Sequence, residues 1–249
     1  MSDKELAIEA RGVHKKYLQN HVLRGFDLEV PAQVSFGCAG VNGAGKSTFL
    51  KCLLDFCYYD KGDIRIFGKP SKNRSSRARL CFLPERFVPP YYLNGRQFVK
   101  FILSLNHATY DEEKTAAMLK DIDLDLDALK KPVRSFSKGM TQKLGLASIF
   151  LLERDLYILD EPMSGLDPKA RALLKRLFQR IRDRGASLFF TSHSLSDIDE
   201  VCERMALLHE GKVAFIGTPA ELMKEQGDAP NLEEAFMRLI SQPEEAAAA

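Results

Sequence analysis

The sequence predicts an α/β fold in which a mostly parallel sheet alternates with helices and is interrupted by an inserted helical segment. Short apolar strand patterns in both halves of the chain alternate with segments of helical periodicity. Between them, from about 94 to 153, the periodicity is mostly helical. Alternating strands and helices favour parallel pairing with right-handed crossovers, so one compact α/β unit with a helical insert is expected.

Alternating or continuous apolar residues predict the strands, and apolar residues three and four apart predict the helices. Strands are expected at 6–10, 22–30, 34–39, 64–67, 80–83, 156–159, 187–190, 205–208 and 213–216. Helices are expected from the glycines after 39 to residue 54, and at 97–105, 111–122 and 140–152. The best specified helix has Asp167 as its N-cap, Pro168 as its first residue and Gly185 as its stop.

The composition excludes several classes of protein. Of the 249 residues, 45% are hydrophobic and 28% are charged, which is typical of a folded chain. The net charge of +2 is too small to predict a protein that mainly coats nucleic acid or acidic lipid. No segment is long and apolar enough to predict a spanning helix, and the start lacks the pattern of a secretory signal, so a cytosolic protein is expected. The five cysteines include no CxxC pair, which is typical of reduced core thiols.

The most informative segment is Gly40-Val-Asn-Gly-Ala-Gly-Lys-Ser47, which matches GxxxxGK[ST], the Walker A pattern, between a predicted strand and a predicted helix. Its glycines allow the backbone to point N–H groups at a triphosphate, which the positive end of the next helix also attracts. Lys46 would reach the β- and γ-phosphates, and Ser47 would place its hydroxyl on Mg²⁺. The simpler alternative is a glycine-rich turn with an incidental lysine. The candidate nucleotide-binding residues here are Gly40, Val41, Asn42, Gly43, Ala44, Gly45, Lys46, Ser47 and Thr48.

Two further strand ends carry candidate catalytic groups. The apolar strand from 156 ends in Asp160, which can hold Mg²⁺, and Glu161, which can polarise a water for attack on the γ-phosphorus. The alternative is a solvated acidic turn. His193 also follows a strand and could hydrogen-bond a γ-phosphate, although a lone histidine is about as often a packed or surface residue. Its position favours function, because ligands bind beyond the carboxyl ends of strands in α/β sheets.

Together these residues resemble the ATP-binding subunit of an ABC transporter, from about residue 6 to 240. The segment specific to that family is Ser135-Phe-Ser-Lys-Gly-Met-Thr-Gln142, which resembles the signature Leu-Ser-Gly-Gly-Gln. Ser137 and Gly139 match the signature, whereas the other three positions differ. This variant resembles the type-two exporter branch of bacterial ABC ATPases.

The resemblance implies a P-loop NTPase core with a mostly parallel sheet, an antiparallel β subdomain and an inserted helical subdomain. A single ABC ATPase domain would cover 1–242, and the tail at 243–249 is expected to be disordered because it has too little apolar variety to pack. The core would comprise 1–85 and 154–225, the helical subdomain about 86–153, and a C-terminal helix about 231–241.

The resemblance also assigns roles to single residues. Tyr17 resembles the aromatic residue that stacks on adenine, although a tyrosine at a strand end more often only packs. Glu85 takes the place of the usual Gln of the Q-loop, where its carboxylate could still reach Mg²⁺ or water. Ser164-Gly-Leu-Asp167 matches the D-loop, and His193 matches the switch histidine. The catalytic candidates are thus Glu161, His193 and Lys46, the metal ligands Ser47, Asp160 and Glu85, and the further ATP contacts Tyr17, Ser137 and Gly139.

The resemblance implies that two such subunits, identical or homologous, close head-to-tail on two ATP molecules and drive transport, in the export direction, through a separate membrane permease. The protein would then hydrolyse ATP to ADP and phosphate at the cytoplasmic face of the membrane, as a peripheral subunit. Phe87, Tyr91, Tyr92 and Leu93 are expected to line the docking groove for the permease, with packing of the first insert helix as an equal alternative for each residue.

The competing interpretation is a soluble ABC-type ATPase that acts on nucleic acid or ribosomes. The basic segment 69–79 could contact phosphates, although a charged segment is usually a solvated surface. The chain has neither a second phosphate loop nor sustained heptads, which such ATPases usually carry. A transporter subunit that binds no nucleic acid is therefore the favoured prediction.

Overall fold

The computed structural model describes residues 5–241 and consists of two compact units. The first unit comprises Met1–Arg79 and Ser187–Ala249, and the second comprises Leu80–Ala186. The expected helical subdomain, 86–153, lies within the second unit, and the expected tail, 243–249, lies outside the described residues. Within residues 5–241, no helix has the length and apolar character that crossing a membrane requires.

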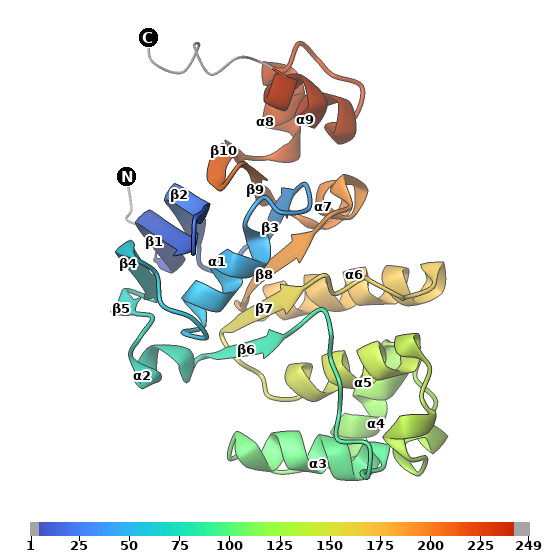
Figure 1. Cartoon of the computed structure of the whole chain (residues 1–249). Coiled ribbons are helices and arrows are strands. Elements are labelled where there is room, and N and C mark those ends of the chain that lie inside the picture. The colour runs from blue at the N-terminus through green and yellow to red at the C-terminus, as the bar shows by residue number, and fades with distance from the viewer. Residues whose placement is uncertain (1–4, 242–249) are drawn as a thin grey trace. The chain divides into compact units, whose positions relative to one another are not determined.

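The first unit contains an antiparallel sheet and a second group of mainly parallel strands (Figure 1). Its strands are β1 (Leu6–Tyr17), β2 (Asn20–Pro31), β3 (Ser35–Gly40), β4 (Lys61–Ile66), β5 (Lys69–Pro70), β8 (Ser187–Ser192), β9 (Arg204–His209) and β10 (Lys212–Gly217). Its helices are α1 (Lys46–Leu53), α2 (Arg74–Arg77), α7 (Leu195–Val201), α8 (Pro219–Glu225) and α9 (Leu232–Ser241). The antiparallel sheet has the order β2-β1-β4-β5. Strand β3 pairs in parallel with β8 on one side and β9 on the other, and β10 pairs antiparallel with β9.

The core of the first unit holds α1 in place against strands from both groups. Every residue of β3 is buried. The ring of Phe49, in α1, lies 4.5 Å from that of Phe26 in β2 and 6.1 Å from that of Phe189 in β8, measured between centroids. Because α1 begins directly after the loop that follows β3, this packing positions the start of the helix.

The second unit contains a parallel strand pair and a group of helices. Its elements are β6 (Leu80–Leu83), α3 (Gly95–Leu105), α4 (Glu112–Asp121), the 3₁₀ turns η1 (Leu126–Leu129) and η2 (Val133–Ser135), α5 (Lys138–Phe150), β7 (Leu156–Asp160) and α6 (Pro168–Asp183). Strands β6 and β7 are parallel, with Leu83 opposite Leu159. Every residue of α5 from Gln142 to Phe150 is buried, so this helix is surrounded by the rest of the unit.

The α/β architecture predicted from the sequence is confirmed, including the mainly parallel strands, the antiparallel strands and the helical insert. The predicted strand at 80–83 is observed at the same residues, and Asp167 caps α6 by accepting from the N–H of Ala170 at 2.9 Å. Strand β1 continues well beyond the predicted end at Ala10, because an irregularity between Ala10 and Val13 breaks the alternation without ending the pairing.

The substitution Phe49→Ala is expected to lower the free energy of unfolding by about 3–5 kcal/mol, because it removes a fully buried ring that packs against two others. Urea unfolding followed by circular dichroism measures this loss. The matched control is Phe101→Ala, since Phe101 is 43% exposed and should cost much less. Equal losses in the two variants would contradict the assigned packing of α1.

Candidate nucleotide-binding site

The loop between β3 and α1 makes a turn that requires glycine. A Cβ atom on Gly40 would lie 2.5 Å from the carbonyl oxygen of Leu208, which belongs to the neighbouring strand β9. Gly45 caps α1 in the left-handed conformation, with φ 111°, where a side chain is disfavoured. The backbone therefore passes abruptly from a buried strand into the N-terminus of a helix, which is the geometry that binds phosphate groups.

Lys46 is folded into this loop. Its ammonium donates to the carbonyl oxygen of Gly40 at 2.5 Å and of Val41 at 3.4 Å, and the residue is only 9% exposed. The adjacent Ser47 hydroxyl lies on an exposed residue. The loop is braced from outside by the N–H of Gly211, which donates to the carbonyl oxygen of Ala44 at 3.2 Å. The residues predicted to hold phosphate thus form one preorganised loop.

His193 leaves the same edge of the parallel strands as the phosphate loop. Strands β3 and β8 run in parallel with Ala39 opposite Ser192, so Gly40 and His193 each follow directly after a paired residue. His193 is exposed and precedes Ser194, the N-cap of α7. This position fits a group that reaches a bound phosphate from the adjacent strand end.

Tyr17 is the last residue of β1 and is 42% exposed. The ammonium of Lys15 lies 4.8 Å from the centre of the tyrosine ring, and the phenol hydroxyl donates to the sulfur of Cys57 at 3.5 Å. This hydrogen bond, with burial, raises the pKa of Tyr17 to about 12, so the side chain stays neutral at physiological pH. An accessible neutral ring is suited to stacking on a nucleobase.

The candidate carboxylates of the second unit lie at the carboxyl ends of β6 and β7. Leu83 and Leu159 are paired, and Glu85 and Glu161 each come two residues later, so both glutamates lie at the same edge of the strand pair. Asp160 is half-buried, and Glu161 has a left-handed backbone, with φ 50°. The carbonyl of Glu161 accepts from the N–H of Ser164 at 3.0 Å, which closes a tight turn. Strained non-glycine residues at strand ends are concentrated at functional sites.

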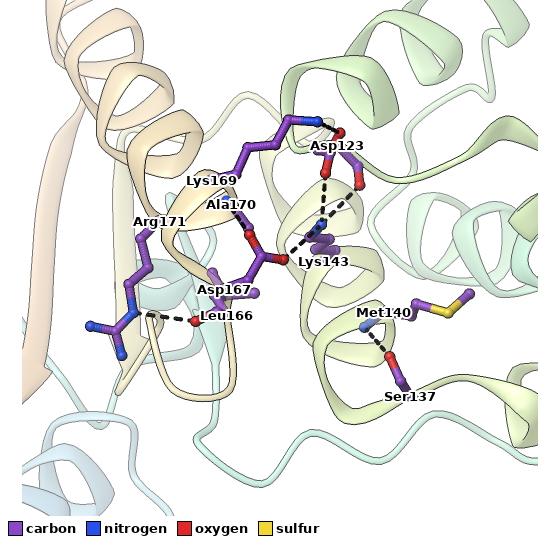
Figure 2. A network of polar contacts seen from close by, with 9 residues as sticks. All are labelled: Asp123, Ser137, Met140, Lys143, Leu166, Asp167, Lys169, Ala170 and Arg171. Carbon is purple, nitrogen blue, oxygen red and sulfur yellow. Dashed lines mark hydrogen bonds and ion pairs between the residues drawn. The ribbon is translucent and has the colours of Figure 1, made fainter.

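The signature residues form the N-terminus of α5 (Figure 2). Ser137 is exposed, and its hydroxyl caps the helix by accepting from the N–H of Met140 at 3.2 Å. A Cβ atom on Gly139 would approach the carbonyl oxygen of Gly165, in the D-loop, to 3.1 Å. The ammonium of Lys138 donates to the hydroxyl of Ser164 at 3.2 Å. The first turn of α5 is therefore packed closely on the loop that follows the acidic strand end.

A network of ion pairs also links α5 to the start of α6 and to Asp123, just after α4 (Figure 2). The side chain of Lys143 is only 10% exposed, and its ammonium donates to the backbone carbonyl of Asp123 at 2.8 Å. The same ammonium lies 3.4 Å from the carboxylate of Asp123 and 3.9 Å from that of Asp167. A hydrogen bond from Lys169 lowers the pKa of Asp123, and the N–H of Ala170 lowers that of Asp167. The sequence analysis missed this network, because no local pattern links residues so far apart in the chain.

A groove of about 560 Å³ in the second unit connects the Q-loop position with the signature. Its lining residues are Glu85, Arg86, Phe87, Val88, Pro89, Tyr91, Val133, Arg134, Phe136, Lys138, Thr141 and Gln142. Of the four residues expected to form a docking groove, Phe87 and Tyr91 line it. The ring of Tyr92 packs edge-on against Tyr91, with centroids 5.6 Å apart, and the carbonyl of Leu93 accepts from the N–H of Val133. Phe87 also packs against Phe98, so it contributes to the helical core as well.

Comparison with known proteins identifies the family. The ABC transporter family model matches residues 23–164. The chain belongs to the ABC transporter ATP-binding proteins. An uncharacterized ABC transporter ATP-binding protein of Nostoc sp. is 33% identical over 234 residues, which is 89% of this chain and 70% of that protein. The Nod factor export ATP-binding protein I of Burkholderia orbicola is 30% identical over 223 residues, or 88% of this chain and 73% of that protein.

A solved structure described as the ATP binding subunit of an ABC transporter matches the fold. It has a TM-score of 0.85 and 27% sequence identity, and the match covers 94% of this chain and 99% of that one. The family and the P-loop fold predicted from the sequence are confirmed, and ABC ATP-binding domains are ATPases. These similar proteins are transporter ATP-binding proteins, so the comparisons lend the nucleic-acid alternative no support.

The substitution Asp123→Asn is expected to make the free energy of unfolding fall less steeply as the pH is lowered. The pKa values of Asp123 and Asp167 are lowered in the folded state, so their stabilisation is present above the ordinary aspartate pKa of about 3.9. It is lost as the pH falls through the lower folded values. Urea unfolding at pH 7 and at steps down to pH 3 measures this loss, with the exposed Asp199→Asn as control. Parallel pH curves for the wild type and Asp123→Asn would contradict the network.

Proposed function

We propose that the chain is the motor subunit of an ABC exporter, which hydrolyses ATP as one of a pair of subunits bound to a separate membrane permease. The observation that carries this proposal is the exposed N-terminus of α5, where Ser137 and Gly139 match the family signature. A helix N-terminus attracts a phosphate group. The signature has no role in a stand-alone kinase. In a head-to-tail pair, it would bind the nucleotide of the other subunit.

The phosphate loop supplies the nucleotide contacts of the first unit. The backbone N–H groups from Gly40 to Thr48 would surround the phosphates, and Lys46 would exchange its carbonyl partners for phosphate oxygens. Tyr17 would stack on the adenine. The preorganised loop and the accessible tyrosine ring support these assignments.

The oxygen donors present suit Mg²⁺. Ser47 offers an exposed hydroxyl and Asp160 a half-buried carboxylate, and Glu85 offers a further carboxylate. Within residues 5–241 there is no group of three or more histidine, cysteine, aspartate or glutamate residues that could hold a metal ion. This fits Mg²⁺, which proteins commonly bind through one or two carboxylates plus substrate phosphates. When bound, the ion would neutralise charge on the phosphates.

In hydrolysis, the carboxylate of Glu161 would accept a proton from the attacking water as the water oxygen bonds to the γ-phosphorus. The bond to the bridging oxygen breaks, and the products are ADP and phosphate. Lys46 would stabilise the charge on the transferred group, and His193 would hydrogen-bond its oxygens. The strained backbone at Glu161 supports the assignment, because non-glycine residues with such a backbone are concentrated at functional sites.

The second subunit, identical or homologous, would contribute the signature. Ser137 and Gly139 of one copy would face the γ-phosphate bound by the other, so each ATP would join the two copies. Hydrolysis would remove that link and allow the pair to open, which is a nucleotide switch of a general kind.

The membrane permease would dock in the groove between the Q-loop position and the signature. The groove is lined by both apolar and polar side chains, and its apolar residues include the highly exposed Val88 and Tyr91. A partner bound there would contact both Glu85 and the start of α5, and would place the subunit peripherally at the cytoplasmic face of the membrane. The export direction is supported by the relative named for Nod factor export.

The substitution Glu161→Gln is expected to lower ATP turnover by about 100-fold or more while ATP binding persists, because the amide keeps the shape but cannot accept the proton. Turnover of the subunit assembled with its permease, and binding of radiolabelled ATP, measure the two properties. The control is Glu153→Gln, an exposed glutamate of the same unit. Unchanged turnover in Glu161→Gln would show that Glu161 is not the catalytic base.

Replacing Tyr91 and Tyr92 together by Ser is expected to abolish recovery of the permease when the subunit is pulled down from detergent-solubilised membranes. Both side chains are about 70% exposed, so the change should leave the fold intact. Tyr58→Ser in the first unit, where Tyr58 is 78% exposed, is the control. Normal assembly of the double variant would overturn docking at this groove, and recovery of ribosomes or DNA instead of a permease would overturn the transport function.

A further inference from the structure

Two of the five cysteines lie in contact, although neither the sequence nor the ATPase function indicated a role for them. The sulfur atoms of Cys52 and Cys57 are 3.5 Å apart. Cys52 is in the last turn of α1, and Cys57 lies in the loop that follows. The chain folds back there because Asp55 has a left-handed backbone, with φ 62°, and the N–H of Cys57 donates to the carbonyl of Lys51 at 3.3 Å.

This sulfur pair touches the residue proposed to stack on adenine. The hydroxyl of Tyr17 donates to the sulfur of Cys57 at 3.5 Å. The side chain of Thr48, at the start of α1, also hydrogen-bonds to Tyr17 and lowers its pKa, against the raising effect of Cys57. A change at the sulfur pair therefore acts directly on a side chain that contacts both the adenine position and the end of the phosphate loop.

We propose that Cys52 and Cys57 are a redox modification site, in which a peroxide converts the two thiols into a reversible disulfide that weakens ATP binding through Tyr17. The effect on ATP rests on the proposed role of Tyr17, whereas formation of the bond does not. Disulfides in the cytosol of mesophiles are usually transient, and many of them act in redox sensing.

The geometry suits the formation of this bond. A disulfide has an S–S distance of about 2.05 Å, so the sulfurs must approach from 3.5 Å by about 1.5 Å. Cys52 is at the end of a helix and Cys57 is in a loop, so the loop side can move without unfolding α1. The ring closed by the bond would contain few residues, and its formation would pull the loop toward the helix end.

The two cysteines have different roles in the reaction. Cys57 is partly exposed, whereas Cys38, Cys52, Cys81 and Cys202 are buried, so a peroxide reaches Cys57 first. The Cys57 thiol releases its proton and the resulting thiolate attacks one peroxide oxygen, so that the O–O bond breaks and the sulfur becomes a sulfenic acid. The hydroxide that leaves takes up a proton and forms one water. The sulfur of Cys52 then attacks the sulfur of the sulfenic acid, and the hydroxyl group leaves with the thiol proton as a second water. Both sulfurs are oxidised, and the peroxide is the species reduced.

Cys52, the buried member of the pair, is protected from direct oxidation by peroxide. Burial raises the pKa of Cys52 to about 12, so its thiol stays protonated and is a poor first target for the oxidant. The nearby ammonium of Lys15 opposes this effect and favours the thiolate. Cys52 is suited to resolving an oxidised Cys57 by its position, because the two sulfurs lie 3.5 Å apart and the attack takes place within one molecule.

The bond is expected to disturb Tyr17. The sulfur of Cys57 moves toward α1 and away from its position opposite the phenol hydroxyl, so the hydrogen bond at 3.5 Å is lost and the ring reorients. The affinity for ATP is expected to fall by about threefold to tenfold, which is the contribution of one hydrogen bond, because this bond no longer holds the ring in its stacking position. Because linkage is reciprocal, saturating ATP should oppose disulfide formation by the same factor.

The experiment uses the full-length subunit, purified in reductant and then treated with hydrogen peroxide. Intact mass spectrometry should show a loss of about 2 Da, and peptide mapping should join Cys52 to Cys57. The dissociation constant for ATP should rise by about threefold to tenfold and return after dithiothreitol. Cys57→Ser and Cys57→Ala should lose both effects, whereas Cys81→Ala, which removes a buried thiol in the second unit, should keep both.

Three results would overturn the proposal. The first is a gain of about 16 or 32 Da without the loss, which indicates sulfenic or sulfinic acid only. The second is a disulfide between two copies of the chain on a non-reducing gel. The third is an internal bond that leaves ATP binding unchanged. Failure of the reduced wild-type protein to bind ATP would instead overturn the proposed function, and the mass measurement would still decide whether the bond forms.

Discussion

The turn from β3 into α1 is the constraint on which the first unit depends. Gly40 approaches the carbonyl of Leu208 so closely that no side chain fits, which ties the phosphate loop to β9. Gly211 is under the same kind of constraint, because a Cβ atom there would lie 2.2 Å from the carbonyl oxygen of Val22. Its N–H donates to the carbonyl oxygen of Ala44 in the phosphate loop. The antiparallel sheet, the parallel strands and the phosphate loop thus meet at two glycines.

A corresponding constraint in the second unit is the packing of α5 on residues 162–167. The buried side chain of Gln142 donates to the carbonyl of Pro162 at 3.1 Å, and Lys143 lies near the carboxylate of Asp167. Gly139 and Gly165 allow the backbones to come close. A buried ammonium such as that of Lys143 is costly unless it is paired, so its partners hold α5 against this loop.

The features that the sequence predicted well have signals within a few neighbouring residues. The phosphate loop depends on eight consecutive positions, and the start of α6 depends on one capping aspartate followed by proline. The helix α8 carries such a signal as well, because Thr218 and Glu221 form a capping box. It was nevertheless missed, since its seven residues are too few for a clear apolar period.

The features that could not be predicted depend on contacts between distant segments or on backbone turns. Lys143 and Asp123 meet only because α5 packs beside the end of α4, and neither residue carries a local sign of its partner. Cys52 and Cys57 are five positions apart, which is not a helical repeat. They meet because the left-handed turn at Asp55 ends the helix between them. The start of α5 at Lys138 rather than Met140 likewise depends on the Ser137 cap, which periodicity alone does not reveal.

The same turn that strains Glu161 also links its backbone to the signature. The carbonyl of Glu161 accepts from Ser164, whose hydroxyl in turn accepts from Lys138 in the first turn of α5. Ser164 therefore hydrogen-bonds both to the backbone of Glu161, the candidate base, and to Lys138 at the N-terminus of α5. Packed interiors do not deform continuously, so α5 cannot shift along this loop without breaking these bonds or moving the turn. The backbone conformation of Glu161 and the position of the first turn of α5 are thus physically dependent on each other within one chain.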